Sequence, residues 1–544
     1  MNGLYDPRGL RSALVRRWYE EGYYSTQTFP QAMAEGHRNY SNRGIVFYSE
    51  GGGTRVLTAD ELYTRARALA GALHRLGIRA GDVVAIQVPN WVEGNLMFQA
   101  TMLLGAVVLP IIHIYGAAEV SYILRQSGAK LLIVPDRWRN IDYLARLAEI
   151  ERPPTLRHVL VIGDAPAGCL GWQALLDTAT HDYPEPELHP DDVALMVFTS
   201  GTTSDPKGVL HSHNSLLAEL RAGWTRTGDG DETRAVVLSP WPAGHIAGVL
   251  GILRLYFSGA ESVLMDAWNA DAAARLVVEY RVTSSSGTPY FINSLLDAAA
   301  AGGHDISTLA TYMVGAANVP PETVERCERL GIVTYRSYGS SEHPTISGGE
   351  PSQPVDKRAN TDGTLRPGVA VRIVDDHGEE VPMGTDGEIL SIGPEQFVGY
   401  QQAAFNADAF DEQGWFRTGD IGRLDEEGYL TITDRKKDII IRGGENIASK
   451  EVEDLLVTLA AVQEVAVTAM PDERLGEKVC AFVVLKRGAR LTLDDVRAHF
   501  VSLKVARQKT PERLEIVADL PRTASGKVKK FELRDRLRTG QSVS

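Results

Sequence analysis

The chain of 544 residues is longer than one hydrophobic core supports, and this length predicts three or four structural units. Its composition, with 44% hydrophobic and 23% charged residues, is typical of a soluble α/β protein and excludes disordered and fibrous classes. The formal net charge of −14 argues against a nucleic-acid partner, because such binding needs a basic face.

The N-terminal stretch and the cysteines together predict a cytoplasmic protein. Residues 1–20 mix arginines with acids and lack the apolar stretch of a secretory signal. Cys169, Cys327 and Cys480 lie far apart, which predicts neither a disulfide framework nor a zinc site. The most apolar window, residues 101–115, is shorter than the ~20 residues that cross a bilayer. We therefore expect no transmembrane segment, while peripheral membrane contact and the oligomeric state stay open.

Helix and strand patterns alternate over residues 55–135. Thr58 and Glu61 form a capping box before a periodic run at 62–76, which predicts a helix that ends near Gly77. Further helices are predicted at 90–104 and 117–127, and strands at 82–88, 106–112 and 130–134. This spacing predicts parallel β-α units with helices on the faces of a sheet.

The same alternation continues beyond residues 184–186, which we interpret as a linker or crossover. An apolar strand at 193–198 precedes a polar loop and a second apolar run at 208–210, and Asn214 is expected to cap a helix at 215–221. Later strands are predicted at 234–239, 261–264, 282–286 and 312–315, and helices at 271–279, 290–300 and 321–330. Short alternating strands at 369–392 predict a small β-rich subdomain.

The polar loop between the two apolar runs has the chemistry of a phosphate-binding loop. Its candidate binding residues are Thr199, Ser200, Gly201, Thr202, Thr203 and Lys207. Backbone N–H groups freed by glycine, hydroxyl donors and one ammonium suit the β- and γ-phosphates of a nucleotide. Lys207 precedes Gly208 and does not open a helix, so the loop is not a Walker A motif. The competing interpretation is a surface turn rich in serine and threonine.

Residues 198–208 resemble the phosphate loop of the adenylate-forming superfamily, which includes acyl-CoA synthetases, luciferases and nonribosomal-peptide adenylation domains. Further stretches resemble the motifs of this superfamily in the same order, at 315–318, 338–342, 415–420 and 521–527. The resemblance covers roughly residues 45–535 and is to the acyl-CoA synthetase branch, whose members include fatty-acid–CoA ligases. It implies ATP, Mg²⁺ and coenzyme A as cofactors, with a small-molecule carboxylic acid as substrate.

The resemblance assigns roles in a nucleotide site. It implies that Tyr338 stacks on adenine, that Ser341 contacts the α-phosphate, and that Glu342 holds Mg²⁺. We expect Ser341 and Glu342 to take part in catalysis. Asp420 would accept hydrogen bonds from both ribose hydroxyls, and Arg435 would add a contact to ribose or phosphate. For each motif taken alone, the competing interpretation is a solvated turn.

Other residues are implied to lie between the nucleotide and the acyl group. Small side chains at Ala316 and Ala317 would let the adenine base approach the backbone. Gly315 and His245 would line the acyl pocket. Two further histidines, His211 and His213, have a spacing seen in metal sites, but no other ligand joins them, so we interpret both as structural.

The C-terminal part of the chain is a separate electrostatic unit. Residues 437–544 carry 20 Lys and Arg against 16 Asp and Glu, a net of +4, whereas residues 1–436 have a net of −18. The resemblance implies that 1–436 is an AMP-binding domain of two α/β subdomains and a β-rich subdomain, and that 437–544 is a small mobile α+β domain. Lys527 would bridge the carboxylate and the α-phosphate, neutralising charge in the transition state. Lys437 would be the hinge, and Gly444 would leave room for the pantetheine arm after rotation.

The implied reaction is the ligation of a carboxylic acid to coenzyme A in two halves. The carboxylate and MgATP give acyl-adenylate and pyrophosphate, and the thiol then displaces AMP. Residues 507–514 resemble ligases for medium-chain and alicyclic acids, so a medium-chain, alicyclic or other fatty acid is expected.

Several alternatives stay open or lose support. An acyl-AMP ligase normally has an insertion between the motifs of Tyr338 and Asp420, and this separation of 82 residues looks uninterrupted. A peptide-synthetase adenylation domain would be followed by a carrier domain, whereas this chain ends at Ser544. An inactive nucleotide-binding module would lack Lys527 or Glu342, and both are present. The motifs do not separate a luciferase-type oxygenase from a ligase.

Overall fold

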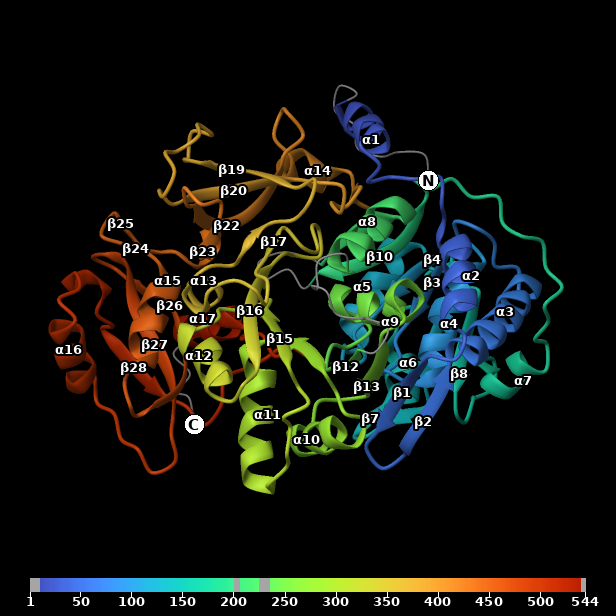
Figure 1. Ribbon diagram of the computed structural model, residues 1–544, viewed down its shortest axis with the longest axis horizontal. Helices are drawn as coiled ribbons and strands as arrows, with labels where there is room; N and C mark the ends of the chain where they lie inside the picture. Colours follow the sequence, from blue (N-terminus) through green and yellow to red (C-terminus); the bar gives the residue numbers. More distant parts are fainter. Residues whose placement is uncertain (1–9, 200–205, 225–234, 540–544) are drawn as a thin grey trace.

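The computed structural model describes residues 10–199, 206–224 and 235–539. A large domain built on three sheets is followed by a small domain built on one, at the left of Figure 1. The large domain combines two α/β subdomains with a β-rich subdomain, and the small domain is α+β, as predicted. No helix in the described part of the chain is both long enough and apolar enough to cross a membrane.

The first α/β subdomain is an eight-stranded sheet with the order β21-β11-β10-β4-β3-β5-β8-β9. Its strands are β3 (Val83–Ile86), β4 (Val107–Pro110), β5 (Leu131–Pro135), β8 (His158–Ile162), β9 (Leu170–Gly171), β10 (Val193–Thr199), β11 (Lys207–Ser212) and β21 (Gly399–Tyr400). The accompanying helices are α3 (Ala59–Arg75), α4 (Val92–Leu103), α5 (Ala117–Ser127), α6 (Tyr143–Glu149), α7 (Trp172–Leu176) and α8 (His213–Trp224), and β6 (Arg137–Trp138) pairs with β7 (Ile141–Asp142). The central strands read as continuous apolar runs because they are buried on both faces.

The structure confirms the capping box at the start of α3 and corrects the predicted start of α8. Glu61 N donates to Thr58 Oγ1 at 3.2 Å, and Thr58 N donates to Glu61 Oε2 at 2.9 Å. Asn214 does not cap α8, because this helix already begins at His213. The Asn214 amide instead donates to Asp191 and accepts from the backbone N–H of Ser25, and so ties two preceding segments to the helix.

The second α/β subdomain is a nine-stranded sheet with the order β18-β17-β16-β15-β14-β12-β13-β1-β2. Its strands are β1 (Gly44–Ser49), β2 (Gly53–Thr58), β12 (Val236–Ser239), β13 (Glu261–Met265), β14 (Ser284–Gly287), β15 (Thr311–Gly315), β16 (Val333–Tyr338), β17 (Ser347–Gly348) and β18 (Thr364–Leu365). Its helices are α9 (Ile246–Ser258), α10 (Ala270–Glu279), α11 (Pro289–Gly302), α12 (Pro321–Arg329) and α13 (Val355–Asn360), and the N-terminal helices are α1 (Leu10–Glu20) and α2 (Phe29–Tyr40). The β1–β2 hairpin joins this sheet although every strand of the first sheet except β21 lies between it and β12 in the sequence.

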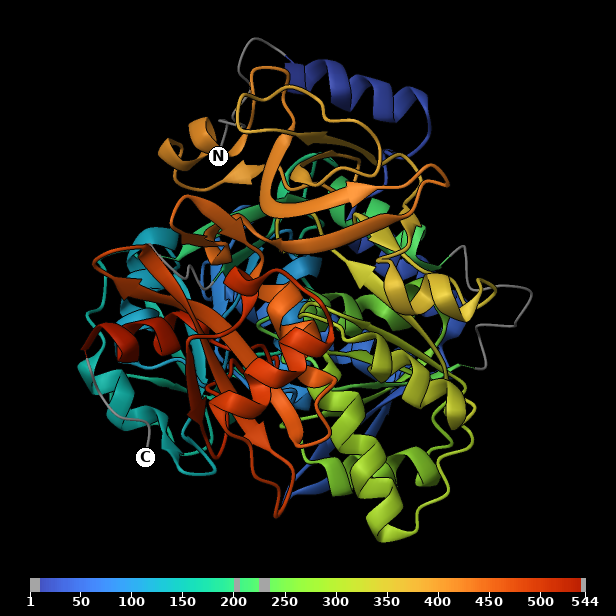
Figure 2. The ribbon, with the colours of Figure 1, turned by 90° about the vertical axis from the view of Figure 1, so that its left-hand side faces the viewer.

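A four-stranded antiparallel sheet forms the β-rich subdomain, which extends the predicted range of 369–392 to Arg435. Its strands are β19 (Ala370–Val374), β20 (Gly387–Ile392), β22 (Phe416–Leu424) and β23 (Leu430–Arg435), with α14 (Ala404–Ala409) beside them. The small domain comprises β24 (Ile440–Arg442), β25 (Glu445–Ile447), α15 (Ser449–Val457), β26 (Val462–Asp472), β27 (Gly476–Leu485), α16 (Leu493–Ser502), η4 (Arg507–Lys509), β28 (Arg513–Ile516) and α17 (Lys530–Thr539). It has a hydrophobic core of its own, and Figure 2 shows it face on below the four-stranded sheet. The short helix η3 (Lys436–Asp438) joins the two domains.

Candidate active site

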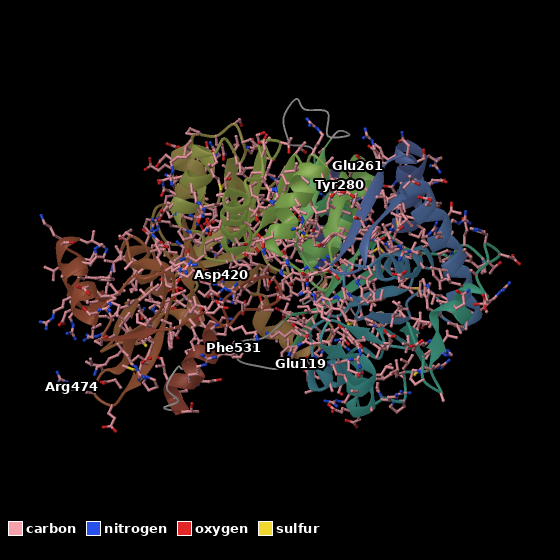
Figure 3. The ribbon with its side chains drawn as sticks, turned by 90° about the horizontal axis from the view of Figure 1, so that it is seen from below. Glu119, Glu261, Tyr280, Asp420, Arg474 and Phe531 are labelled. Carbon is pink, nitrogen blue, oxygen red and sulfur yellow. The ribbon has the colours of Figure 1, made fainter. Side chains whose placement is uncertain are left out.

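The candidate site lies where strand ends of the large domain meet the small domain. β16 ends at Tyr338, β22 carries Asp420, and β23 ends at Arg435. Asp420 and Arg435 are directly paired across β22 and β23, so their side chains share one face of the sheet. Figure 3 shows Asp420 at the junction of the two domains. The fold therefore brings together three predicted residues that come from two sheets.

Two hydrogen-bonding partners hold the Asp420 carboxylate in a fixed orientation. The Tyr338 hydroxyl donates to Oδ2 at 2.8 Å, and Arg435 Nε contacts Oδ1 at 3.1 Å. Burial, reinforced by the Asp420 charge, raises the pKa of Tyr338 well above its ordinary value, so the phenol stays a donor. Each carboxylate oxygen has a second lone pair, which suits the acceptance of hydrogen bonds from a diol.

The Glu342 carboxylate is held by Tyr400, for which there was no sequence prediction. The Tyr400 hydroxyl donates to Glu342 Oε1 at 2.8 Å. The ammonium of Lys207 lies 4.9 Å from the centre of the Tyr400 ring and 4.9 Å from that of Phe405. The loop lysine and the candidate metal carboxylate therefore share one aromatic partner.

The predicted phosphate loop is the tip of a hairpin. Thr199 ends β10 and Lys207 begins β11, and these two residues pair with each other in the antiparallel register. This pairing places the two ends of the loop side by side, where β10 ends and β11 begins. Ser200, Gly201, Thr202 and Thr203 lie outside the described residues.

The two histidines of β11 and α8 have structural roles, as predicted. His211 Nε2 lies 2.7 Å from the backbone carbonyl of Ser341, a donor contact that fixes the loop before Glu342. His213 Nδ1 accepts from the backbone N–H of Phe29 at 3.2 Å. Burial lowers the pKa of His213 to about 4, so its imidazole is neutral.

The donor chemistry around Glu342 fits a magnesium ion that is shared with phosphates. Within residues 10–199, 206–224 and 235–539, no group of three or more His, Cys, Asp or Glu side chains is arranged to hold a metal ion. Mg²⁺ bound with a nucleotide needs only one or two protein carboxylates, because phosphate oxygens and water complete its coordination. Glu342 is half-buried beside the ends of the phosphate loop and fits that role.

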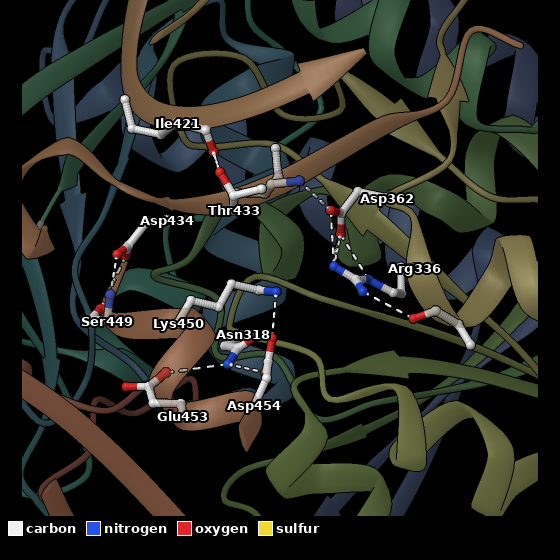
Figure 4. Close-up of polar contacts among 12 residues, drawn as sticks. Asn318, Arg336, Asp362, Ile421, Thr433, Asp434, Ser449, Lys450, Glu453 and Asp454 are labelled. Atoms are coloured by element: carbon white, nitrogen blue, oxygen red, sulfur yellow. Dashed lines mark hydrogen bonds and ion pairs between the residues drawn. The ribbon is translucent and has the colours of Figure 1, made fainter. Parts of the chain in front are cut away.

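The small-residue segment after β15 lies between the nucleotide-site residues and the small domain. A Cβ atom on Gly315 would lie 2.4 Å from the carbonyl oxygen of Ser337 in the neighbouring strand, so no side chain fits there. Ala316 has φ of 60°, an unfavourable backbone conformation for alanine of a kind found often at functional sites. Ala317 is exposed. Asn318 Nδ2 donates to Glu453 Oε2 at 3.3 Å and to Asp454 Oδ1 at 3.2 Å on α15 of the small domain (Figure 4).

The small domain directs Lys527 to the carboxylates of the large domain. Gly526, with φ of 79°, lies so close to Thr288 that a Cβ atom would be 2.8 Å from the threonine hydroxyl. Arg522 stacks on the Tyr290 ring at 4.9 Å, which holds the other end of the same loop. Burial and the nearby Arg435 lower the pKa of Lys527 to about 8, against the opposing charges of Asp420 and Glu342.

His245 lies close enough to Lys527 for the two groups to interact electrostatically. Its Nδ1 caps α9 by accepting from the backbone N–H of Ala247 at 3.2 Å, and its ring stacks on Trp241 with centroids 5.1 Å apart. Burial, with a smaller effect of the Lys527 ammonium, lowers the pKa of His245 to about 3. The imidazole is therefore neutral and fixed in orientation.

The predicted hinge, Lys437, lies between two residues whose side chains contact different domains. Lys436 Nζ contacts Glu388 Oε2 of the large domain at 2.9 Å, whereas Asp438 Oδ1 accepts from Arg534 of α17 at 2.6 Å. Lys437 is the residue between these two anchors. Gly444 lies in the exposed turn between β24 and β25, with φ of 89°. The role predicted for it, room for the pantetheine arm, applies to the small domain after rotation.

Sequence reasoning missed the residues that join the motifs. Tyr400 connects Lys207 to Glu342, and Asn318 connects the large domain to α15. Asp434 accepts from the Ser449 hydroxyl at 3.1 Å at the start of α15 (Figure 4). A buried carboxylate or tyrosine in a short strand gives no local pattern, so only the tertiary contact identifies these residues.

A buried carboxylate bonded to a tyrosine and an arginine, a second carboxylate beside a loop lysine, and a lysine from the small domain are the arrangement expected of a nucleotide-using ligase. Residues 34–401 match the family described as AMP-binding enzyme, and residues 451–527 match the AMP-binding enzyme C-terminal domain. The first match covers more than half of the chain. The protein therefore belongs to the AMP-binding enzyme family of adenylate-forming acid ligases.

Individual relatives cover nearly the whole chain. The medium-chain fatty-acid–CoA ligase of Escherichia coli (strain K12) is 36% identical over 483 residues, which are 88% of this chain and 85% of the relative. A salicylyl-CoA synthase / salicylate adenylyltransferase of a Streptomyces species is 33% identical over 540 residues, 96% of each chain. The structure of ATP-bound MatB from Rhodopseudomonas palustris has a TM-score of 0.80 and 26% identity, covering 94% of this chain and 99% of that chain. These matches confirm the predicted superfamily, fold class and enzymatic nature.

Proposed function

We propose that this protein is an ATP-dependent carboxylic acid–CoA ligase that acts on a medium-chain, alicyclic or other fatty acid. The observation that carries the proposal is that the loop with Lys527, from the small domain, packs on Thr288 and Tyr290 of the large domain, where Asp420, Arg435 and Glu342 affect the pKa of Lys527. An ammonium at this position can bridge the carboxylate of the substrate and the α-phosphate of ATP. The similarity to a relative named as a medium-chain fatty-acid–CoA ligase supports the acid class and the acceptor.

In the first half-reaction, ATP lies across the motifs of the large domain. Asp420 binds the ribose hydroxyls, Arg435 supports that carboxylate, and Tyr338 lies beside the adenine. Lys207 and the loop residues before it bind the β- and γ-phosphates, and Ser341 contacts the α-phosphate. Mg²⁺ held at Glu342 supplies charge neutralisation on the phosphate oxygens.

Lys527 acts where charge concentrates during acyl-adenylate formation. A carboxylate oxygen attacks the α-phosphorus, the bond to the bridging oxygen of pyrophosphate breaks, and pyrophosphate leaves with its electron pair. The Lys527 ammonium contacts both the carboxylate and the α-phosphate, which repel each other in its absence. Neutral His245 and Gly315 line the entrance to the acyl pocket without adding charge.

In the second half-reaction, coenzyme A releases the acyl group from AMP. The thiol loses its proton and attacks the acyl carbon, the bond to the adenylate oxygen breaks, and AMP leaves. We place the domain boundary at 436/437, so that rotation about Lys437 withdraws Lys527 and brings the turn with Gly444 to the site. The side chains of Lys436 and Asp438, which are anchored in different domains, support this boundary.

An acyl-AMP ligase that passes the acyl group to a carrier protein is the second candidate. One observation favours it: the relative from Streptomyces has a name that covers both CoA-ester synthesis and adenylyl transfer. Both candidates share the first half-reaction and differ only in the acceptor thiol.

A pyrophosphate-release screen tests the proposal directly. Purified protein is given MgATP and acids of graded chain length and ring size, and products are analysed with and without coenzyme A. We expect a medium-chain or alicyclic acid to give the fastest release and acyl-CoA to form only when coenzyme A is present. Pyrophosphate release without any acyl-CoA would favour the carrier-protein candidate, and no release with any acid would exclude both.

Asp420→Ala should raise the ATP Michaelis constant by about tenfold or more while lowering turnover less. The reason is that the ribose contacts are made equally in ground and transition states, and a hydrogen bond to a charged group contributes about 1.5–3 kcal/mol. Steady-state pyrophosphate release at varied ATP measures this split. Thermal unfolding serves as the control for lost stability, and an unchanged ATP constant would remove Asp420 from the nucleotide site.

The adenylation rate should fall as the pH rises through about 8. Burial has lowered the pKa of Lys527 to about 8, and only the ammonium form bridges two anions, so activity is lost on its deprotonation. The kcat/KM for ATP between about pH 6 and pH 10 reports this free-enzyme pKa. In Lys527→Arg the guanidinium stays protonated, so the decline should disappear even if the rate is lower. A decline that persists unchanged in the arginine variant would assign it to another group.

A further inference from the structure

A tyrosine outside all the predicted motifs connects the two phosphate-side elements of the site. The Tyr400 hydroxyl donates to Glu342 Oε1 at 2.8 Å, and its ring lies 4.9 Å below the Lys207 ammonium. Tyr400 is buried, so both contacts are made away from bulk water. A cation over an aromatic face and a hydroxyl bonded to a carboxylate are each more favourable in such surroundings.

The backbone of Tyr400 is fixed on both sides, which makes its side chain a rigid support. Val209 of β11 pairs with Tyr400 in the first sheet, and this strand begins at Lys207. The Tyr400 backbone N–H donates to Asn406 Oδ1 at 2.7 Å, and Asn406 Nδ2 donates back to the Tyr400 carbonyl at 3.1 Å. The position of the ring is therefore set by the strand that carries the loop lysine.

The same short segment also fixes the backbone of Glu342. The backbone N–H of Phe397 donates to the Glu342 carbonyl at 2.7 Å. The Phe397 ring packs edge to face against the Tyr400 ring with centroids 4.9 Å apart. Residues 397–400 thus contact Glu342 twice, once through its main chain and once through its carboxylate. This double contact orients the carboxylate relative to Lys207.

We propose that Tyr400 is a positioning residue that orients Glu342 for Mg²⁺ and holds Lys207 at the phosphates. This assignment rests on the proposed function, in which Glu342 is the metal carboxylate. A partner hydrogen-bonded to a metal-binding carboxylate fixes its orientation, and removal of such a partner typically weakens metal binding by about 10–100-fold. The Tyr400 hydroxyl contacts Glu342 and the ring contacts Lys207, so substitutions can remove the first contact without the second.

The test is direct binding of ATP by calorimetry, once with Mg²⁺ and once with EDTA. In Tyr400→Phe the ring remains and the hydroxyl is lost, so the gain in ATP affinity caused by Mg²⁺ should fall by about tenfold while metal-free affinity is kept. In Tyr400→Leu both contacts are lost, so metal-free affinity should fall as well. Tyr19→Phe is the matched control, because Tyr19 also donates to an aspartate, Asp191, at 3.2 Å outside the site.

A double-substitution cycle separates positioning from a general packing effect. In the double variant with Glu342→Gln, the Tyr400→Phe change should not reduce the gain in ATP affinity caused by Mg²⁺ any further. The reason is that both substitutions disrupt the same interaction between Tyr400 and Glu342. If Tyr400→Phe keeps the full gain in ATP affinity caused by Mg²⁺, or if the losses in the double variant are additive, the role assigned to Tyr400 is wrong. Either result would leave the metal role of Glu342 in place. A full Mg²⁺ gain in Glu342→Gln would instead overturn the metal role of Glu342 in the proposed function, and the role of Tyr400 with it.

Discussion

Lys527→Ala should lower acyl-adenylate formation by about 10³-fold or more while leaving thioester formation from pre-made acyl-adenylate nearly intact. Loss of a cation that stabilises charge in phosphoryl transfer has effects of this size. The lysine is assigned to the first transition state only, so the second half-reaction does not need it. Pyrophosphate release from acid and ATP measures the first half, and acyl-CoA formation from synthetic adenylate measures the second.

Lys529→Ala is the matched control for this experiment. Lys529 belongs to the same loop, but its ammonium contacts Glu532 of α17, within the small domain, at 2.8 Å. Its loss should leave both half-reactions close to the parent rates. Thermal unfolding of both variants separates a loss of rate from a loss of stability. Equal loss of both halves in Lys527→Ala would refute the assigned role.

The sequence predicted those parts of the site that are carried by local motifs. Tyr338, Asp420 and Arg435 follow or occupy strands, and their resemblance to known motifs predicts that they share one site; in the structure their side chains are in contact. The capping box of α3 and the alternation from 82 to 134 were predictable for a similar reason, because neighbouring residues determine them. Local pattern is sufficient where the interacting groups are close in sequence.

The parts that sequence reasoning missed depend on contacts between distant residues. Tyr400 belongs to a two-residue strand, and its partners Lys207 and Glu342 lie far from it along the chain. The β1–β2 hairpin reaches the second sheet by pairing with β13, and nothing within the hairpin distinguishes that sheet from the first. Asparagine often caps a helix, so the sequence predicts a cap at Asn214, but this side chain instead contacts Asp191 in a preceding segment. Hydrophobic periodicity contains no information about such partners.

The start of α15 in the small domain has further contacts with the large domain. Asn318 donates to Glu453 and Asp454, and Asp434 accepts from Ser449, so the start of α15 is held at two places by the large domain. Lys530 contacts Glu453 Oε1 at 2.7 Å, and Glu453, Asp438 and Asp434 together raise the pKa of Lys530 although burial opposes them. A rotation of the small domain would break the contacts of Asn318 and Asp434, whereas the contact between Lys530 and Glu453 lies within the small domain.

Lys437→Pro should keep acyl-adenylate formation and lower thioester formation by about 10²-fold or more. Proline fixes φ near about −65°, a value that the short 3₁₀ helix at Lys436–Asp438 already favours, so the present position is tolerated. Any state that requires another φ at residue 437 is excluded. The two half-reactions are measured separately, as for Lys527.

Lys437→Ala separates the backbone effect from the loss of the ammonium. Alanine removes the same side chain and leaves φ free, so it should support thioester formation at a rate close to that of the parent. The contacts of Lys436 with Glu388 and of Asp438 with Arg534, in different domains, are the reason for proposing Lys437 as the hinge. If the proline variant makes acyl-CoA at the parent rate, the hinge lies at another residue or both halves proceed in one arrangement of the domains. If the alanine variant loses thioester formation as fully as the proline variant, the side chain of Lys437 is required and its backbone freedom is not the cause.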